Sequence, residues 1–444
     1  MWLHPSCDEH VFPSDREFSV SHLRHDVAPV LRRQADQQCD IFFDRDAGLG
    51  SKATVKIVCI NDQPLPLHET DCEQVASMVS ALGQAGAQVD LWLPSTRSGE
   101  PPTVERISNY YAVKDSFSVR TFASVFPAPR WLEKSAHAAV CLRALRQTDC
   151  HAVYTRNIPM ALAALEGTDK PVIYETYRRW TRDYKITRPA FARMVKHPRL
   201  AAFVTHSRLA AESYFHLGLP KNRCLIAHNG FDPERMTPVL SQEEARRAVG
   251  LPATGPIVTY SGHVTMQKGL GLVLDLAEAL PHALFVIVGS QGMGEVEVRA
   301  QSLPNVRIVP WLQGKGPIPY LYASDVLLIP PTSGPLEKIG NTVLPIKTFQ
   351  YLAAGRTIVA PATPDVMEVL EDGRNAVLLA PDQLDEAKRR LGALLADQAQ
   401  MTRLAQAARS DSERFTWLGR ARRFLEFVAS SPAAANHKRA APSP

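Results

Sequence analysis

Several features that would decide the class of this protein are missing from its sequence. No apolar run in the 444-residue chain approaches the roughly 20 residues that span a bilayer, which argues against a membrane-embedded protein. The seven cysteines are scattered and form no CxxC pair, so neither a disulfide framework nor a zinc site is indicated. The chain opens on a charged segment rather than on a signal peptide. We therefore expect a soluble, cytoplasmic protein with reduced thiols and no metal ion.

The composition adds a mild basic excess to a globular profile. The chain is 45% hydrophobic and 21% charged, with a formal net charge of +5. That charge suits anionic ligands or a membrane surface and does not require nucleic acid. The length favours two domains or three, each able to bury its own core.

Apolar runs of strand length alternate with helical patterns along most of the chain. A first series of runs covers 55–60, 88–93, 152–154, 171–174 and 202–205, with a helix expected at 71–85. A second series covers 256–260, 283–288, 306–309, 326–329, 357–360 and 376–379. Such alternation predicts an α/β fold with right-handed crossovers and parallel sheets. Two series predict two doubly wound, Rossmann-like domains that face each other across a cleft, with the ligand at the strand C-terminal edges.

Turn residues place the boundary between the two series. Asn229-Gly230 is followed by Asp232-Pro233, which is strong turn punctuation. The expected divisions are an N-terminal extension (1–52), a first domain (53–228), a second domain (229–414), a closing helix that packs back on the first domain (415–430) and a disordered tail (431–444).

The stretch 335–361 has the pattern of a phosphate-binding helix start. A charged turn at 337–341 precedes an apolar-periodic run, with Pro345 suited to the first helical turn and Gly355 to the end of the helix. A loop that enters a helix N-terminus gathers unpaired N–H groups and the positive end of the helix dipole. Both favour a phosphate.

Six segments of the chain occur in an order that is shared with one enzyme family. They are 227–232 (AHNGFD), 261–270 (SGHVTMQKGL), 287–290 (IVGS), 323–326 (ASDV), 345–355 (PIKTFQYLAAG) and 415–417 (FTW). In these segments the chain resembles the retaining glycosyltransferases of the GT-B fold, family 4 (glycosyl transferases group 1). The resemblance covers about 200–420, whereas 54–200 match only in their strand–helix rhythm.

This resemblance implies an enzyme of glycan biosynthesis. Such a hexosyltransferase moves a sugar from a nucleotide-sugar donor, a UDP-sugar by default, to an acceptor with retention at the anomeric carbon. It implies that the first domain binds the acceptor and the second binds the donor, without a metal ion and with no cofactor beyond the nucleotide sugar. A glycan, a lipid-linked saccharide or a small molecule are all possible acceptors.

The donor site needs cations and hydroxyl-binding groups. Breaking the anomeric bond develops negative charge on the diphosphate, which fixed cations and N–H donors stabilise. We expect Lys268 to supply that charge, with His263 beside it if protonated. Glu337 is expected to orient the donor sugar, and Gln350 to bond the ribose. The predicted donor-binding residues are Gly262, His263, Lys268, Ser290, Leu312, Glu337, Ile339, Gly340, Asn341, Thr342, Val343, Leu344 and Gln350.

Acceptor-side residues are expected where strands of the first domain end. His68 and Glu69 follow the first strand, and Arg156 and Glu175 end two later strands. The predicted catalytic residues are Glu337, Lys268 and His68, and no metal ligands are predicted. A structural loop histidine is the alternative interpretation of His68.

The chain departs from the family at several positions. The family commonly has two glutamates at positions that match Thr342 and Gln350, and an arginine where His263 stands. Its glycine-rich turn after the first strand is replaced by 61–68. Two alternatives therefore stay open: a non-catalytic GT-B-like subunit that binds a nucleotide sugar or a partner enzyme, and a nucleotide-sugar epimerase.

One basic stretch stands apart from these motifs. Residues 177–199 combine many arginines and lysines with Trp180, Tyr184 and Phe191. This pattern suits peripheral contact with the inner face of an anionic membrane, or a phosphate-bearing acceptor. A solvated basic face is the alternative, and no nucleic-acid motif accompanies the stretch. Lys347 is interpreted as structural or solvated.

Overall fold

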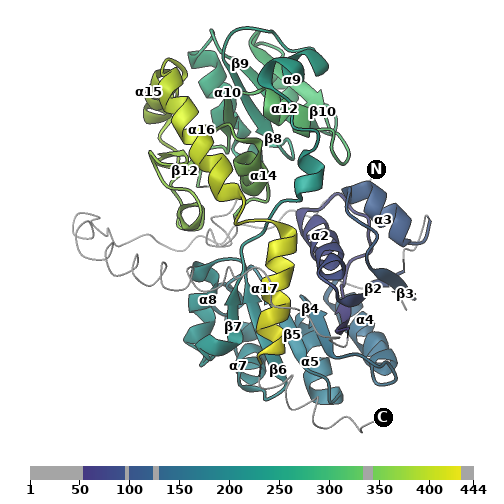
Figure 1. The fold of residues 1–444 in the computed structure, drawn as a ribbon. Coiled ribbons are helices and arrows are strands. Elements are labelled where there is room, and N and C mark those ends of the chain that lie inside the picture. The colour runs from purple at the N-terminus through teal and green to yellow at the C-terminus, as the bar shows by residue number, and fades with distance from the viewer. Residues whose placement is uncertain (1–53, 96–99, 124–129, 334–343, 432–444) are drawn as a thin grey trace, which may run out of the picture. The chain divides into compact units, whose positions relative to one another are not determined.

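The computed structural model describes residues 54–95, 100–123, 130–333 and 344–431 (Figure 1). These residues belong to one compact unit. The predicted N-terminal extension and residues 432–444 of the predicted tail lie outside the described ranges. None of the helices in these ranges is both long enough and apolar enough to cross a membrane.

Within the described residues, the first sheet has seven parallel strands in the order β3-β2-β1-β4-β5-β6-β7. The strands are β1 (Lys56–Ile60), β2 (Gln88–Pro94), β3 (Ser118–Phe122), β4 (Ala152–Thr155), β5 (Val172–Thr176), β6 (Leu200–Thr205) and β7 (Cys224–Ile226). The order reverses between β1 and β4. That reversal defines the switch point where doubly wound sheets open a crevice at their C-terminal ends.

Helices cover both faces of the first sheet, so its central strands are buried and mostly apolar. The helices are α2 (Thr70–Gln84), α3 (Val104–Tyr111), α4 (Arg130–Leu145), α5 (Ile158–Gly167), α6 (Trp180–Asp183), α7 (Arg188–Lys196) and α8 (Arg208–Phe215), with 3-10 turns η1 (Lys185–Thr187) and η2 (Lys221–Arg223). The start of α5 shows how a cap fixes the switch point: Met160 N donates to Asn157 Oδ1 over 2.7 Å. Asn157 Nδ2 in turn bonds Asp62, which follows β1.

The second sheet repeats this plan with six described parallel strands in the order β10-β9-β8-β11-β12-β13. The strands are β8 (Ile257–Ser261), β9 (Leu284–Ser290), β10 (Val306–Pro310), β11 (Val326–Leu328), β12 (Thr357–Pro361) and β13 (Val377–Leu379). Its switch point lies between β8 and β11. The loops after these two strands are therefore the expected ligand loops.

Helices again pack on both faces of the second sheet. They are α9 (Gln242–Ala248), α10 (Leu270–Ala279), α11 (Glu295–Ala300), α12 (Ile318–Ala323), α14 (Lys347–Ala354), α15 (Leu384–Leu395) and α16 (Gln398–Ser412), with 3-10 turns η3 (Pro233–Met236), η4 (Met266–Lys268) and η5 (Val366–Glu368). α14 ends at Gly355, which has φ 61° and supplies the left-handed C-cap.

The chain passes between the two sheets twice, and the two passages lie side by side. Phe231 N donates to the carbonyl of Phe415 over 2.9 Å, and Trp417 N donates to the carbonyl of Phe231 over 3.0 Å. A Cβ on Gly230 would lie 2.8 Å from the Phe415 carbonyl oxygen, so only glycine allows this approach. Beyond it, α17 (Trp417–Ala429) packs on α2 and places Trp417 and Phe424 in the core of the first sheet (Figure 1).

The predicted fold class is confirmed, and the sequence missed two strands. β3 has mostly exposed side chains and β7 has only three residues, so neither carries a clear apolar pattern. Pro345 does not lie inside α14, because the helix begins at Lys347; the Pro345 carbonyl instead accepts a turn bond from Thr348 N over 2.9 Å.

Candidate functional site

The loop after β8 lies at the switch point of the second sheet and is held by close backbone contacts. Gly262 has φ 147°, and its N–H donates to the carbonyl of Val288 over 2.9 Å. A Cβ on Gly289 would collide with the Gly262 carbonyl, so both positions favour glycine. Gly262 is a predicted donor residue. The structure places it at the switch point of the second sheet, with the Lys347 side chain against it.

His263 and Lys268 extend from this loop into solvent. The carbonyl of His263 accepts a hydrogen bond from the Tyr260 hydroxyl over 2.8 Å, while its ring is exposed. Lys268 ends the 3-10 turn η4, and Gly269 then starts α10 in a left-handed conformation at φ 78°. Lys268 is exposed, and no described carboxylate forms an ion pair with it. Its ammonium group is available to an anion.

Lys347, which the sequence interpretation set aside, lies against the same loop. Its Nζ is 3.8 Å from the centroid of the Tyr260 ring, and a Cβ on Gly262 would lie 2.5 Å from that Nζ. Burial, and then the charge of Lys268, lower the pKa of Lys347 well below its ordinary value. One sequence signal was available: the lysine lies in the first turn of the helix that was predicted to bind phosphate.

The structure describes only some of the other residues that were predicted to bind the donor. Gln350 is half-buried on α14, and the neighbouring Tyr351 hydroxyl accepts a bond from Ser261 N over 2.8 Å, which ties the helix to the β8 loop. Leu344 is buried. The remaining predicted donor residues lie outside the described residues: Glu337, Ile339, Gly340, Asn341, Thr342 and Val343. Their proposed contacts stay predictions.

Ser290 and Leu312 follow β9 and β10, next to β8 in the sheet. The Ser290 hydroxyl donates to the Glu297 carboxylate over 2.6 Å, and its carbonyl accepts from Trp311 N over 2.7 Å. Leu312 is half-buried and packs on the core of the second sheet. Both residues lie at the same edge as Gly262, and their contact with a nucleobase stays a prediction.

His68 brings the loop after β1 to the second sheet. Its ring meets Trp311 edge-on with centroids 4.6 Å apart, and lies 6.2 Å from the ring of His263. Burial, and then the nearby His263, lower the pKa of His68. A neutral His68 thus lies beside the β8 loop. The adjacent Glu69 is exposed at the N-cap of α2, where its side chain makes no capping bond.

Glu175 is not an open acceptor-side carboxylate, because it is 3% exposed and fully bonded. Its Oε2 accepts from the Tyr154 hydroxyl over 2.8 Å and from Arg420 over 3.2 Å, and its Oε1 lies 2.7 Å from His206 Nε2. Burial alone would raise the pKa of Glu175, but Arg420 and His206 hold it well below its ordinary value. Glu175 therefore anchors α17 to the first sheet.

Of the groups around Glu175, His206 is buried and Arg156 is partly open to solvent. Burial lowers the pKa of His206 to about 4, so its ring is neutral and donates to Glu175. Arg156 lies next to this network, half-buried, with its guanidinium 5.3 Å from the centroid of the Tyr177 ring and one N–H directed at the carbonyl of Asp71. Of the two predicted strand-end residues, only Arg156 keeps a partly open position.

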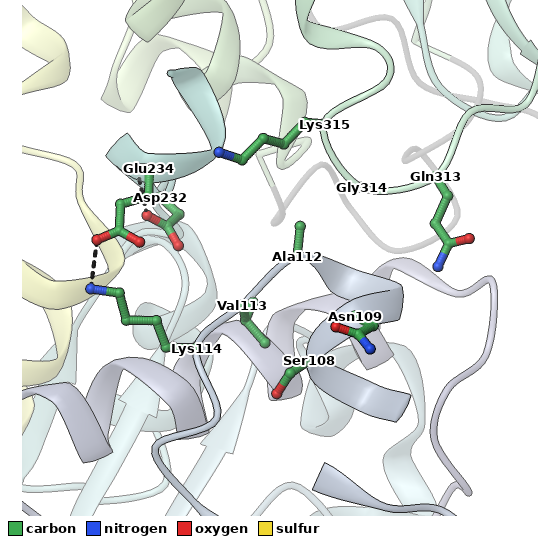
Figure 2. Close-up of a pocket in the computed structure, with 10 residues that line it drawn as sticks. All are labelled: Ser108, Asn109, Ala112, Val113, Lys114, Asp232, Glu234, Gln313, Gly314 and Lys315. Carbon is green, nitrogen blue, oxygen red and sulfur yellow. Dashed lines mark hydrogen bonds and ion pairs between the residues drawn. The ribbon is translucent and has the colours of Figure 1, made fainter. Parts of the chain in front are cut away.

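A separate pocket of about 540 Å³ contains none of the predicted site residues (Figure 2). It is lined by the end of α3 and the residues that follow it, by the start of η3 and by the loop after β10: Ser108, Asn109, Ala112, Val113, Lys114, Asp232, Glu234, Gln313, Gly314 and Lys315. Lys114 pairs with Glu234 over 2.5 Å at its wall. Across the described residues, no group of three or more histidine, cysteine, aspartate or glutamate side chains is arranged to hold a metal ion.

Family models match both halves of this arrangement. The model described as glycosyl transferases group 1 matches residues 241–411, and the model described as glycosyltransferase family 4 matches residues 73–235. The chain belongs to the group 1 glycosyltransferases. The GT-B assignment made from the sequence motifs is thereby confirmed.

Individual relatives of this group 1 chain are distant. It is 30% identical over 229 residues to a D-inositol 3-phosphate glycosyltransferase from Xylanimonas cellulosilytica, covering 48% of this chain and 53% of that protein. It is 26% identical over 202 residues to the sulfoquinovosyl transferase SQD2 of Arabidopsis thaliana, covering 44% of this chain and 38% of that protein. The chain thus spans about half or less of the length of the curated relatives that it matches.

A solved structure shares the fold over nearly its whole length. The Anabaena protein Alr3699/HepE, crystallised in complex with UDP, superposes with a TM-score of 0.66 at 16% identity. The match covers 85% of this chain and 100% of that one. It supports the GT-B fold of the described residues.

Proposed function

We propose that this group 1 protein is a glycosyltransferase that moves a sugar from a nucleotide-sugar donor, a UDP-sugar by default, to an acceptor with retention of anomeric configuration. The observation that carries the proposal is the approach of His68 to His263. The first residue follows β1 and was predicted on the acceptor side, whereas the second lies in the predicted donor loop. Their rings, 6.2 Å apart, join the switch points of the two sheets.

The proposed chemistry follows from the charges at this junction. The bond between the anomeric carbon and the diphosphate oxygen breaks as the bond to the acceptor oxygen forms on the same face. The acceptor proton passes to the departing phosphate oxygen. Lys268 stabilises the negative charge that develops on the diphosphate. In this proposal a fixed cation of the protein, rather than a metal ion, provides that stabilisation. A neutral His68 can hold a hydroxyl of donor or acceptor by a hydrogen bond.

Related proteins support the donor class. UDP is bound in the Anabaena structure, and UDP-glucose is bound in another crystal structure of the same protein. For the acceptor, the name of the Xylanimonas cellulosilytica relative favours an inositol phosphate, which is a polyol phosphate with hydroxyl groups that can act as the nucleophile. We propose no further cofactor and a cytoplasmic location.

The first experiment is a thermal-shift screen of the purified protein across UDP-, GDP- and ADP-linked sugars, because a ligand of the folded state raises the melting temperature. The stabilising donor is then incubated with and without candidate acceptors. Transfer to an acceptor supports the proposal. An epimerised donor without acceptor identifies an epimerase, and binding without turnover of any kind identifies a non-catalytic subunit.

We also propose that the segment 182–189 touches an anionic membrane surface. Ile186 is 90% exposed and Tyr184 is 47% exposed, which is unusual for large apolar side chains. Three exposed cations, Arg182, Lys185 and Arg188, flank them. An apolar tip ringed by cations suits the interface of anionic lipids, where each cation contributes about 1 kcal/mol.

Vesicle sedimentation tests this contact. The protein should pellet with phosphatidylglycerol vesicles and not with phosphatidylcholine vesicles, and Ile186→Asp should reduce the pelleted fraction. Val298→Asp is the matched control, since Val298 is a 56% exposed apolar residue on α11. Equal pelleting of all three proteins would rule out this segment as the contact.

A further inference from the structure

Lys347 occupies an unusual position for a lysine. It is the first residue of α14, at the C-terminal edge of the second sheet, where the helix N-terminus favours anions. Its side chain crosses to the β8 loop, where Nζ rests on the ring of Tyr260 and lies beside Gly262. The absence of a Cβ on Gly262 is what leaves room for the ammonium group.

No described carboxylate balances the charge of Lys347. Among the described residues it takes part in no ion pair, and the charged group that faces it is Lys268, whose proximity lowers its pKa further. Within the described residues, the other titratable side chains of β8, its following loop, η4 and α14 are Tyr260, His263, Lys268 and Tyr351. Both tyrosines stay neutral, since burial raises the pKa of each. The Tyr260 face offers only a partial substitute for an anion.

An unpaired hydroxyl lies beside Gly269, the residue after Lys268. Thr332 Oγ1 is buried without a partner in the described structure, and a Cβ on Gly269 would lie 2.6 Å from it. Gly269 directly follows Lys268. Among the described residues, neither lysine has an anionic partner and the Thr332 hydroxyl has no partner, although buried polar groups are normally paired.

We propose that Lys347 binds the diphosphate of the donor together with Lys268. This inference rests on the proposed function, because it assigns a residue to the same donor site. The positive charges of the two lysines repel each other. The negative charge of a bound diphosphate attracts both lysines. It thereby raises the pKa of Lys347, which then takes up a proton. Lys347 is then a second phosphate-binding residue of the site.

The sign of the pH dependence follows from this coupling. A ligand that raises the pKa of Lys347 binds most tightly at low pH, where the lysine already carries its proton. Affinity then falls as the pH rises from the pKa of the free site toward that of the complex. At a pH between these two values, binding takes up a proton.

Calorimetry with UDP-glucose, uridine and inorganic pyrophosphate tests the assignment. UDP-glucose is suitable because its diphosphate is substituted at both ends and does not itself titrate near neutral pH. Lys347→Met should weaken the binding of UDP-glucose and of pyrophosphate by about 10- to 100-fold, which is the range for charge-assisted hydrogen bonds. It should leave the affinity for uridine unchanged. Lys347→Arg should recover much of the affinity. In buffers of different ionisation enthalpy, the wild-type heat should report proton uptake that Lys347→Met lacks.

The matched control is Lys388→Met, which removes a half-buried lysine on α15 that pairs with Asp385 over 3.8 Å. It should bind all three probes as the wild type does, and circular dichroism checks that each variant is folded. The assignment would be overturned if Lys347→Met lost affinity for uridine and UDP-glucose equally, or lost affinity for neither. If the wild-type protein binds no nucleotide sugar, the proposed function itself fails; if it binds and Lys347→Met binds equally, only the role of Lys347 fails.

Discussion

At the C-terminal ends of the second sheet, the charge of Lys268 acts on Lys347 and lowers its pKa, and no described carboxylate pairs with either lysine. At the same ends of the first sheet, Glu175 and Arg420 are 3.2 Å apart and both are buried. Both edges carry charged side chains, but only at the first sheet are they paired with an opposite charge from within the described protein. Unpaired charge at a sheet switch point indicates a ligand, whereas a paired and buried charge indicates structure.

This difference separates the donor assignment from the acceptor assignment. The donor loop keeps Gly262, His263 and Lys268 accessible, as the sequence motifs led us to expect. On the acceptor side, Glu175 is used to hold α17, and only His68, Glu69 and Arg156 remain near open surface. The predictions below test this division from the largest expected effect to the smallest.

Arg420→Met should destabilise the protein most. It leaves the Glu175 carboxylate buried without its cation, and breaking a buried pair in this way costs about 3–5 kcal/mol. The free energy of unfolding from urea denaturation measures the effect. Arg422→Met, an exposed position on the same helix, should change it by less than about 0.5 kcal/mol. Equal effects of the two substitutions would show that Glu175 is not an anchor for α17.

Stability should fall with acidification because His206 resists protonation in the folded state. Its folded pKa is about 4, below its ordinary value of 6.5. The unfolded chain therefore binds the proton first, and stability should decline by up to roughly 3 kcal/mol as the pH falls from 6.5 toward 4. His206→Gln removes the titrating ring and should flatten this part of the profile. A variant profile as steep as that of the wild type would contradict the prediction.

Lys268→Ala should abolish or severely weaken donor binding while the fold survives. Loss of one charge-assisted contact to a phosphate costs about 1.5–3 kcal/mol in binding free energy. Calorimetry with the stabilising nucleotide sugar measures it, and an unchanged melting temperature shows that the exposed lysine is not structural. Near-normal donor affinity would remove Lys268 from the site.

Gln350→Glu should have the smallest effect. The resemblance places a glutamate at this position, and a carboxylate accepts ribose hydroxyls more strongly than an amide does. Donor affinity should be equal to or better than that of the wild type in the same calorimetric assay. Complete loss of binding would mean that Gln350 does not contact the ribose.

The sequence predicted the alternating strands and helices better than it predicted the contacts of individual side chains. Strands such as β5 are buried along their whole length and carry continuous apolar runs, so they were recognised, whereas the exposed edge strand β3 was not. Lys347 was missed because its position depends on Tyr260 and Gly262, which come from a strand and loop far earlier in the chain. Glu175 was misjudged for the same reason, since its partner Arg420 arrives on the last helix.

The most direct test of the central claim is nuclear magnetic resonance of the reaction product. The purified protein is supplied with an α-linked nucleotide sugar that stabilises it and with polyol-phosphate and lipid acceptors. We predict release of the nucleoside diphosphate and an acceptor that carries the sugar in the same α configuration. Transfer with inverted configuration, or no transfer from any nucleotide sugar to any acceptor tested, would contradict the account.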